Sequence, residues 1–364
     1  MRKKIDALYV HIPFCEHLCA YCDFTKLFYN EHFAGPYLKA LFQEIDYYRI
    51  NKVKTIYIGG GTPTALSIVE LDYLLAKVSP KLESGGEFTV EGNVENLSYD
   101  KLILLKKYGV NRLSIGVEAT SEKALKLLGR NHTFDDAKKV IQKAKDLGFD
   151  NINVDLIYGY PGQSLIDLRN DLDNVLSLKV EHISIYSLTV EKGTMFAVKN
   201  IKEQDDEQSR IFYEEILKTL RSHGYKRYEV SNFALPNHFS KHNLTYWKDE
   251  CYFGIGLGAS GYIDNYRYSN TKNLNKYIKG NFLDEREVLS YEEEIEDFLL
   301  TNFRLEDGFK ASIFKERFGV EFMDLFAKKA KKLIDNKLLI AIGDTIKLSD
   351  EGILLLNRVL LDLL

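Results

Sequence analysis

Residues 8–24, LYVHIPFCEHLCAYCDF, are the stretch around which the chain is organised. A short apolar strand ends at Pro13 and runs into a loop that carries Cys15, Cys19 and Cys22. The spacing C-x3-C-x2-C places three thiols within eight residues, so they can bind one inorganic centre. Soft thiolate ligands favour an iron–sulfur cluster or zinc.

Both kinds of centre have to be weighed for this loop. Three thiolates can hold three irons of a [4Fe–4S] cube, which leaves the fourth iron open to another molecule. Structural zinc takes four protein ligands, usually in paired C-x2-4-C units, and no second pair follows here. A zinc site would therefore need Cys251, His11 or His17 as its fourth ligand.

The composition predicts a folded protein, most simply of two domains, without a nucleic-acid partner. The chain has 364 residues, is 45 % hydrophobic and carries a net charge of −4, so it can bury a large core and lacks a basic surplus. Three of its four cysteines are clustered, which fits a reducing compartment. The first residues contain no signal-peptide core, and no stretch reaches the roughly 20 apolar residues of a membrane span. We therefore expect a soluble, cytoplasmic protein.

Apolar strands alternate with helical patterns through the first half of the chain, which is typical of βα units and a parallel sheet. Six strands are predicted, at residues 8–12, 55–58, 87–91, 112–118, 152–158 and 182–189. Helices are predicted at residues 34–50, 67–78, 98–108, 133–147 and 164–178. Because eight such units close a full barrel, six predict an α/β fold with an open, partial (β/α)6 barrel and a lateral mouth.

Candidate binding residues stand where these strands end, which is where parallel α/β architectures place their ligand sites. Residues 59–62, GGGT, follow the second strand, and glycines let backbone groups approach a ligand. A plain tight turn is the alternative for this triplet. Glu91, Glu118 and Asp155 lie on the next three strands, where an acid is otherwise a solvated residue or a helix cap. Three carboxylates converging on one rim favour a binding site.

The central part of the chain is harder to interpret. A charged stretch leads into a helix over residues 202–223, and a strand is predicted at 228–234, YEVSNFA. Residues 256–261, GLGASG, fit the spacing G-x-G-x-x-G, but they lack the strand–helix context of a dinucleotide-binding loop. Closely packed or flexible backbone is therefore the preferred interpretation.

From residue 291 the pattern changes to short helices and one hairpin. Helices near 291–301, 311–317 and 321–335, a hairpin at 338–348 and a last helix at 350–362 predict a smaller α+β winged-helix-like domain. Acidic residues outnumber basic ones there, so a lid or docking surface is favoured over DNA binding. We expect a barrel over 1–235, an extension over 236–290 and this domain over 291–364.

Tyr9, His11, Pro13, the three cysteines and residues 21–24 together resemble the opening of the radical S-adenosylmethionine (SAM) proteins, in the version Y-x-H-I-P-F-C-x3-C-x2-C of the HemN/HemW family. The resemblance covers essentially the whole chain. It implies a [4Fe–4S] cluster on Cys15, Cys19 and Cys22, with SAM at the open iron. The positions that it implies for SAM binding are Tyr9, Phe24, Gly59, Gly60, Gly61, Thr62, Glu91, Glu118, Arg130, Asp155 and Ile157.

By the same resemblance, Arg130 would pair with the carboxylate of SAM, while Glu91 and Asp155 would bind its ribose and neighbouring groups. Two residues depart from the family pattern. Glu118 stands where glutamine is usual, and Val94 stands where proline is usual. A carboxylate only accepts hydrogen bonds, so Glu118 could hold ribose hydroxyls but would repel the SAM carboxylate.

The family has two branches, and three features of the chain favour the haem-chaperone branch. HemN enzymes resemble this chain but carry a fourth cysteine where Phe24 stands, and they have a long N-terminal extension before the position of Tyr9. Residues 242–247, HNLTYW, match an H-N-x-x-Y-W motif that the resemblance associates with haem binding. It implies His242, Asn243, Tyr246 and Trp247 as haem contacts, since imidazole ligates haem iron and aromatic rings cover the macrocycle. A folded structural loop is the alternative.

We therefore expect a SAM- and cluster-binding chaperone that binds haem as cargo and passes it to apo-haemoproteins, for example of the respiratory chain. No nucleic-acid partner is expected, and a transient membrane contact or a dimer is compatible with this reading. The alternative is an enzyme that uses SAM-derived radical chemistry for the oxidative decarboxylation of coproporphyrinogen propionates. In that chemistry the cofactor supplies the reactivity and the protein supplies orientation and exclusion of water.

Overall fold

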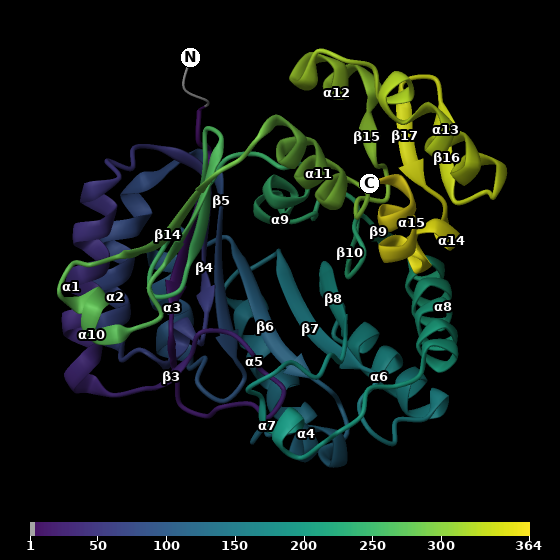
Figure 1. Ribbon diagram of the computed structural model, residues 1–364. Helices are drawn as coiled ribbons and strands as arrows, with labels where there is room; N and C mark the ends of the chain where they lie inside the picture. Colours follow the sequence, from purple (N-terminus) through teal and green to yellow (C-terminus); the bar gives the residue numbers. More distant parts are fainter. Residues whose placement is uncertain (1–3) are drawn as a thin grey trace.

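The computed structural model describes residues 4–364, and a curved sheet of six parallel strands dominates it (Figure 1). These strands are β1 (Ala7–Ile12), β4 (Val53–Gly60), β5 (Leu82–Asn93), β6 (Arg112–Glu118), β7 (Ile152–Tyr158) and β8 (His182–Ser187). They are hydrogen-bonded in chain order. Most of their residues are buried, as expected for strands covered on both faces. The predicted partial barrel is confirmed.

Helices that follow the strands cover the outside of the sheet (Figure 1). Because each helix returns the chain to start the next parallel strand, all six strands end at the same rim. These are α1 (Glu31–Tyr47), α2 (Ile68–Val78), α3 (Tyr99–Lys107), α5 (Phe134–Asp146) and α6 (Leu165–Ser177). Ser67, Thr133 and Ser164 begin three of them with capping boxes. The short helices that were not predicted include α4 (Glu122–Leu128) and α7 (Met195–Val198), because so few residues give little helical periodicity.

Additional strands extend the sheet at both ends. Strand β11 (Phe253–Ile255) pairs in parallel with β1. At the other end β10 (Asn232–Ala234) runs antiparallel to β8 and pairs with β9 (Lys226–Arg227). The single strand predicted at 228–234 was therefore wrong, since residues 228–231 form the turn between two short strands. Because β11 and β9 lie at opposite ends of the strand order, the barrel stays open.

Residues 236–290 pack against the barrel. Helix α9 (Lys241–Trp247) lies against β4, and the strands β12 (Ser260–Ile263), β13 (Tyr266–Asn270) and β14 (Leu283–Val288) form an antiparallel sheet. The glycine-rich turn between β11 and β12 is closely packed, because a side chain at Gly256 would lie 2.4 Å from the His11 carbonyl oxygen. The Gly256 amide donates to the buried Glu44 carboxylate of α1 at 2.9 Å. This amide is therefore not available to the phosphate of a dinucleotide.

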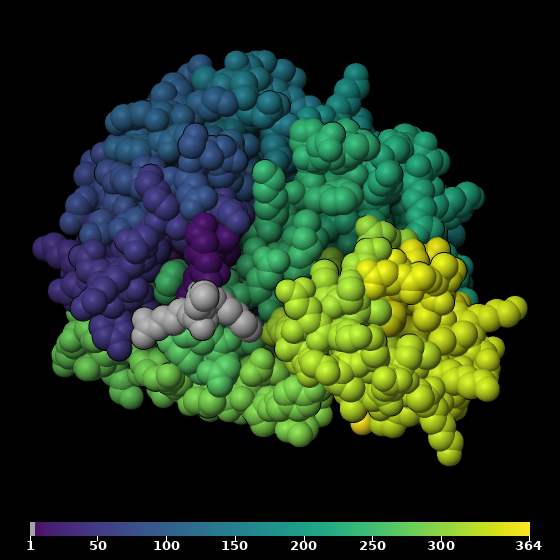
Figure 2. Space-filling view, turned by 90° about the horizontal axis from the view of Figure 1, so that it is seen from above, coloured from purple at the N-terminus to yellow at the C-terminus, as the bar shows by residue number. Residues whose placement is uncertain are grey.

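The C-terminal domain has its own core and forms a separate lobe beside the barrel (Figure 2). Its elements are α11 (Tyr291–Asn302), β15 (Phe309–Lys310), α12 (Ala311–Phe318), α13 (Phe322–Asp335), β16 (Leu339–Ile342), β17 (Thr345–Leu348), α14 (Asp350–Leu354) and α15 (Leu356–Leu363). The predicted last helix is thus split at Leu355. The three strands form one small sheet, which matches the predicted winged-helix-like arrangement. The exact domain boundaries stay a prediction.

Ion pairs attach this domain to the barrel through α8 (Asp206–Ser222) and β9. Arg221 pairs with Asp350 at 3.1 Å, and the buried Arg227 pairs with Asp350 and Glu306. Within residues 4–364, no helix combines the length and the apolar character that a membrane crossing requires.

Candidate functional site

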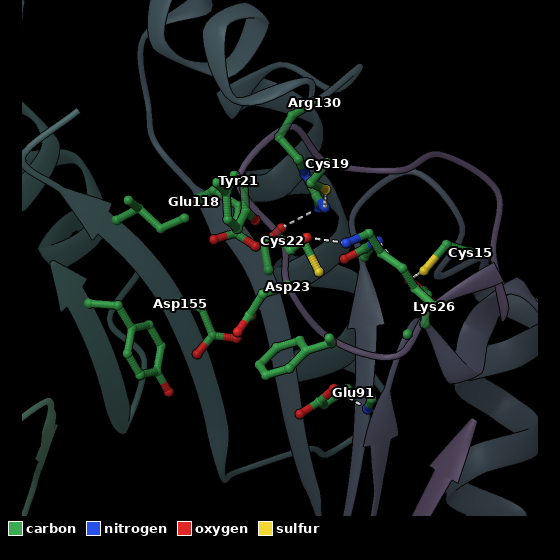
Figure 3. A pocket seen from close by; sticks show the side chains of 18 of the residues that line it. Cys15, Cys19, Tyr21, Cys22, Asp23, Lys26, Glu91, Glu118, Arg130 and Asp155 are labelled. Carbon is green, nitrogen blue, oxygen red and sulfur yellow. Dashed lines mark hydrogen bonds between the residues drawn. The ribbon is translucent and has the colours of Figure 1, made fainter. Parts of the chain in front are cut away.

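The cysteine loop closes over the rim of the barrel at the carboxyl ends of the strands. Strand β2 (Phe14–Cys15) pairs with β3 (Leu27–Phe28), and this pairing brings the two ends of the loop together. Cys15 is buried, whereas Cys19 and Cys22 are partly exposed. All three thiols line one cavity of about 350 Å³ (Figure 3). The Lys26 ammonium donates to the Cys22 carbonyl oxygen, and this hydrogen bond stabilises the folded conformation of the loop.

The arrangement of the thiols fits a cluster better than a single ion. Among residues 4–364, no three His, Cys, Asp or Glu side chains are grouped tightly enough to hold one metal ion. In a cubane each thiolate binds a different iron, so three sulfurs need to share a cavity but need not converge on one point. Of the three candidate fourth ligands for zinc, His17 lines this cavity with the thiols, whereas His11 and Cys251 do not. The zinc alternative therefore depends on His17 alone.

Burial favours the protonated form of two of these thiols. It raises the pKa of Cys15 to about 11, while the Thr62 hydroxyl, which lies 3.5 Å from the sulfur, acts in the opposite direction. Burial likewise raises the pKa of Cys22. Thiolates are the metal-binding form, so uptake of iron by this loop is expected to release protons.

Three carboxylates from neighbouring strands face the loop across the cavity (Figure 3). Burial raises the pKa of Glu91 and of Glu118 to about 7, and it also raises the pKa of Asp155. Glu91 accepts from the Tyr57 hydroxyl at 2.6 Å, and Asp155 accepts from the Asn153 amide at 2.8 Å. The predicted convergence of these acids on one rim is what the structure has, and it makes the cavity attractive to a cationic ligand.

The glycine turn after β4 depends on close contacts at Gly60. Its φ of +110° is one that residues with a side chain rarely adopt. A Cβ here would lie 2.4 Å from the His11 ring. The Gly60 amide donates to Glu91 at 3.0 Å, so the turn and the acid rim hold each other in place. Gly60, Gly61 and Thr62 line the cavity, and their amides donate to Glu91 and to the carbonyl oxygens of Ile12 and Phe14.

Arg130 reaches the cavity from the loop after α4 and is held by groups that sequence patterns did not reveal. Its guanidinium donates to the Gly116 carbonyl at 2.8 Å and to Glu95 at 3.2 Å, and it lies 3.5 Å from the Cys19 sulfur. The Arg130 Nε is buried without a partner among residues 4–364, which leaves hydrogen-bonding capacity for an anionic group such as a carboxylate. His132 Nδ1 lies 3.0 Å from Glu95. Although burial raises the pKa of Glu95, the His132 and Arg130 contacts lower it to about 2.

The structure separates the predicted SAM residues into two groups. Those that line the cavity with the cysteines are Phe24, Gly60, Gly61, Thr62, Glu91, Glu118, Arg130, Asp155 and Ile157. Gly59 and Tyr9 do not line it, and Tyr9 faces a second cavity instead. Lining residues that sequence analysis missed include Tyr21, Tyr57, Asn93, Ser114, Tyr186 and Leu188. Of these, Asn93 could have been found as a polar residue at a strand end, and the others carry no such signal.

The four residues predicted as haem contacts lie on α9, outside the cysteine cavity. His242 is fully buried, and both of its ring nitrogens are engaged, with the Thr55 hydroxyl at 2.9 Å and the Tyr246 hydroxyl at 2.7 Å. Burial lowers its pKa to about 3. In this arrangement His242 offers no nitrogen to an iron, so the geometry matches the alternative of a structural loop. Haem contact by Asn243 and Trp247 stays a prediction.

Glu118 is expected to destabilise the cluster-free protein at neutral and alkaline pH. Its raised pKa means that the folded state favours the protonated carboxyl. The resulting loss in the free energy of unfolding is absent below pH 4.5, the usual pKa, grows between pH 4.5 and about 7, and stays constant above pH 7. Glu118→Gln should therefore raise Tm by several degrees at pH 8 and much less at pH 5. Thermal unfolding followed by circular dichroism measures this. An equal gain at both pH values, or a gain in the exposed control Glu316→Gln, would contradict the explanation.

The chain is similar to known proteins along nearly its whole length. Residues 9–175 match the model of the Radical SAM superfamily, and residues 289–355 match that of the HemN C-terminal domain. A protein of Bacillus subtilis named heme chaperone HemW is 40 % identical, with 98 % of each chain covered. Its counterpart in Lactococcus lactis is 38 % identical over 99 % of this chain and 97 % of that protein.

A solved structure superposes on both domains of the chain. The structure of coproporphyrinogen III oxidase (HemN) from Escherichia coli, described as a radical SAM enzyme, superposes with a TM-score of 0.86 at 25 % sequence identity. The superposition covers 99 % of this chain and 90 % of that one. The chain therefore belongs to the HemN/HemW family of radical SAM proteins.

Proposed function

We propose that this protein is a haem chaperone that binds a [4Fe–4S] cluster and SAM, takes up haem and delivers it to haemoproteins. The observation that carries this proposal is the similarity to proteins named heme chaperone HemW along nearly their full length, including the C-terminal domain. Family membership implies the cluster and SAM. The identity of the recipients, with respiratory-chain apo-haemoproteins as one class, and a dimeric state are part of the same proposal.

The cysteine cavity is proposed to hold both cofactors. Cys15, Cys19 and Cys22 would bind the cluster, and the open iron would be left to the amino and carboxylate groups of SAM. Arg130 is suited to the SAM carboxylate because its buried guanidinium keeps a nitrogen without a partner in the described chain. The acid rim is suited to a sulfonium cation, and its raised pKa values mean that a bound cation would draw protons off it.

When bound, the cluster and SAM together supply one-electron chemistry, and the chain's own residues orient SAM and exclude water. The backbone of residues 60–62 would receive the methionine end, while Glu91 and Asp155 would accept from ribose hydroxyls. Ile157 and Phe24 provide apolar surface in the same cavity. Each of these roles is supported by the shared cavity and the orientation of these side chains.

A second candidate is the oxidative decarboxylation of coproporphyrinogen, and the superposition on HemN over 99 % of the chain favours it. Against it stands Phe24, which occupies the position where the resemblance places a further cysteine in HemN enzymes. The side chain of Phe24 is 64 % exposed at the edge of the cavity, so it cannot replace a thiol as a ligand but can face an apolar molecule.

One anaerobic experiment separates the two candidates. Reconstituted protein is mixed either with ferric haem or with coproporphyrinogen, SAM and a reductant. We expect a Soret band to appear at stoichiometric haem and no porphyrinogen to be consumed. Turnover of coproporphyrinogen, or failure to take up haem, would contradict the chaperone function.

A further inference from the structure

A second cavity, of about 660 Å³, lies between the end of β1, the cysteine loop and the small sheet β12–β14. It adjoins the cysteine cavity, because Asp23 and Phe24 line both. Its size falls in the range of cavities that bind cofactors, which is about 300–1,000 Å³. A ligand here would therefore lie beside the proposed SAM site.

Aromatic side chains form one wall of this cavity. Tyr246 and Tyr252 have ring centroids 4.6 Å apart at an interplanar angle of 72°, and Tyr9 and the exposed Phe24 line the same space. Ser260 and Ser269, which are direct cross-strand neighbours with short side chains, line the same cavity. A space lined by aromatic rings and small residues fits a flat molecule with an apolar face.

Among the possible iron ligands that line this cavity, most are already engaged. His11 has one ring nitrogen 3.0 Å from the Tyr9 hydroxyl and the other 2.8 Å from the Thr25 carbonyl oxygen. The Tyr246 hydroxyl bonds His242. The Tyr252 hydroxyl has no hydrogen bond to another side chain or carbonyl within residues 4–364, and a tyrosine is an established axial ligand of haem iron.

We propose that this second cavity receives the macrocycle of ferric haem, with the Tyr252 oxygen facing the iron. The inference rests on the proposed chaperone function and deepens it, since it moves the cargo site from His242 on α9 to the cavity beside it. Binding the ferric ion to the phenol oxygen displaces its proton to solvent and needs no redox partner.

Charged side chains at the edge of the cavity determine which way the propionates of a bound haem would point. Asp23, Asp284 and Glu285 are carboxylates at the edge of the cavity, and Lys272 is the ammonium among the lining residues. Glu285 and Lys272 are exposed. The two propionates of haem would therefore point outward, toward Lys272 and solvent, and the acidic rim would weaken binding. Weak retention of this kind suits a cargo that must be released.

The test is a titration of the reconstituted protein with ferric haem, followed by the Soret band. Ser260→Trp fills the cavity from an exposed strand position and is expected to weaken haem binding by about tenfold or more, with cluster absorbance unchanged. Ser177→Trp, on the exposed end of α6, is the matched control and should bind as the unaltered protein does. Equal binding by both variants would overturn the cavity assignment and leave the chaperone function standing. No haem uptake by the unaltered protein would instead overturn that function and this inference with it.

Two further variants do not depend on blocking the cavity. Tyr252→Phe should retain haem but change its ferric absorption and electron paramagnetic resonance spectra, and unchanged spectra would overturn the ligand assignment. Glu285→Lys should bind haem several-fold more tightly, because it removes a repulsive charge and adds an attractive one, whereas Glu316→Lys on the exposed face of α12 should not. A gain of affinity in Glu285→Lys that Glu316→Lys does not share is specific to the cavity, and equal affinity in both lysine variants would count against the proposed entry of the propionates.

Discussion

Replacing Cys15, Cys19 or Cys22 by alanine is expected to abolish the visible absorbance of the reconstituted cluster. Each thiol lines the same cavity, and a cubane held by three thiolates already lacks a fourth protein ligand, so the loss of one more leaves two. Absorbance near 400 nm and iron content after anaerobic reconstitution measure the effect, about tenfold or more in each variant.

Cys251→Ala is the matched control for these three variants. Cys251 is buried outside the cysteine cavity, with its sulfur 3.8 Å from the Asp264 carbonyl oxygen, so its replacement should leave the cluster intact. An intact chromophore in any of the three loop variants would contradict ligation by these thiols. Loss of the chromophore in Cys251→Ala would show instead that a fourth protein ligand closes the cluster, and zinc in place of iron would overturn the cluster altogether.

Arg130→Met is expected to destabilise the protein by about 3 kcal/mol, because removing one partner of a buried ion pair leaves the other charge uncompensated. The Arg130 side chain is 3 % exposed and its partner Glu95 is 15 % exposed. His132 still contacts Glu95 and limits the loss. The lowered pKa of Glu95 means that its stabilising contribution is present above pH 4.5 and is lost only as the pH falls through about 2, so the full effect applies at pH 7. Urea unfolding of the cluster-free protein measures it.

Two controls separate this cause from a general loss of packing. Glu95→Gln combined with Arg130→Met removes both charges, so the double variant should recover a large part of the stability lost in Arg130→Met. Arg169→Met breaks an ion pair of similar length with Glu215, in which the arginine side chain is 51 % exposed instead of 3 %, and should change stability little. If the double variant is as unstable as Arg130→Met, an uncompensated Glu95 is not the cause, and the loss comes from packing or from Glu118, another charged neighbour of Arg130.

The strands and the cysteine loop could be predicted because they depend on neighbours in the sequence. Apolar runs of β-branched residues fix β4, β6 and β7 locally, and the chain order of the strands follows from short right-handed crossovers. The shared rim of Gly60, Glu91 and Asp155 could be predicted in the same way, because the carboxyl ends of parallel strands meet at one edge of the sheet. This approach failed at α4 and at the two short strands β9 and β10, where too few residues carry a periodic pattern.

Contacts between distant segments could not be predicted in this way. The pair of Glu95 with Arg130, the bond of Gly256 to Glu44 and the pairing of β11 with β1 each join residues far apart in the chain. His242 illustrates the consequence. Its motif indicated a ligand, but the surrounding Thr55 and Tyr246 hydroxyls, which decide its chemistry, are visible only in the folded structure.

The sequence by itself determined the partial barrel, the three thiols and the carboxylates of the rim, because strand periodicity and cysteine spacing are local properties of the chain. Only the tertiary structure decided that Tyr9 and Tyr252 line a second cavity and that both ring nitrogens of His242 are engaged. The physical reason is that a side chain's availability depends on which hydrogen bonds it has already made, and those partners are set by packing across the whole fold.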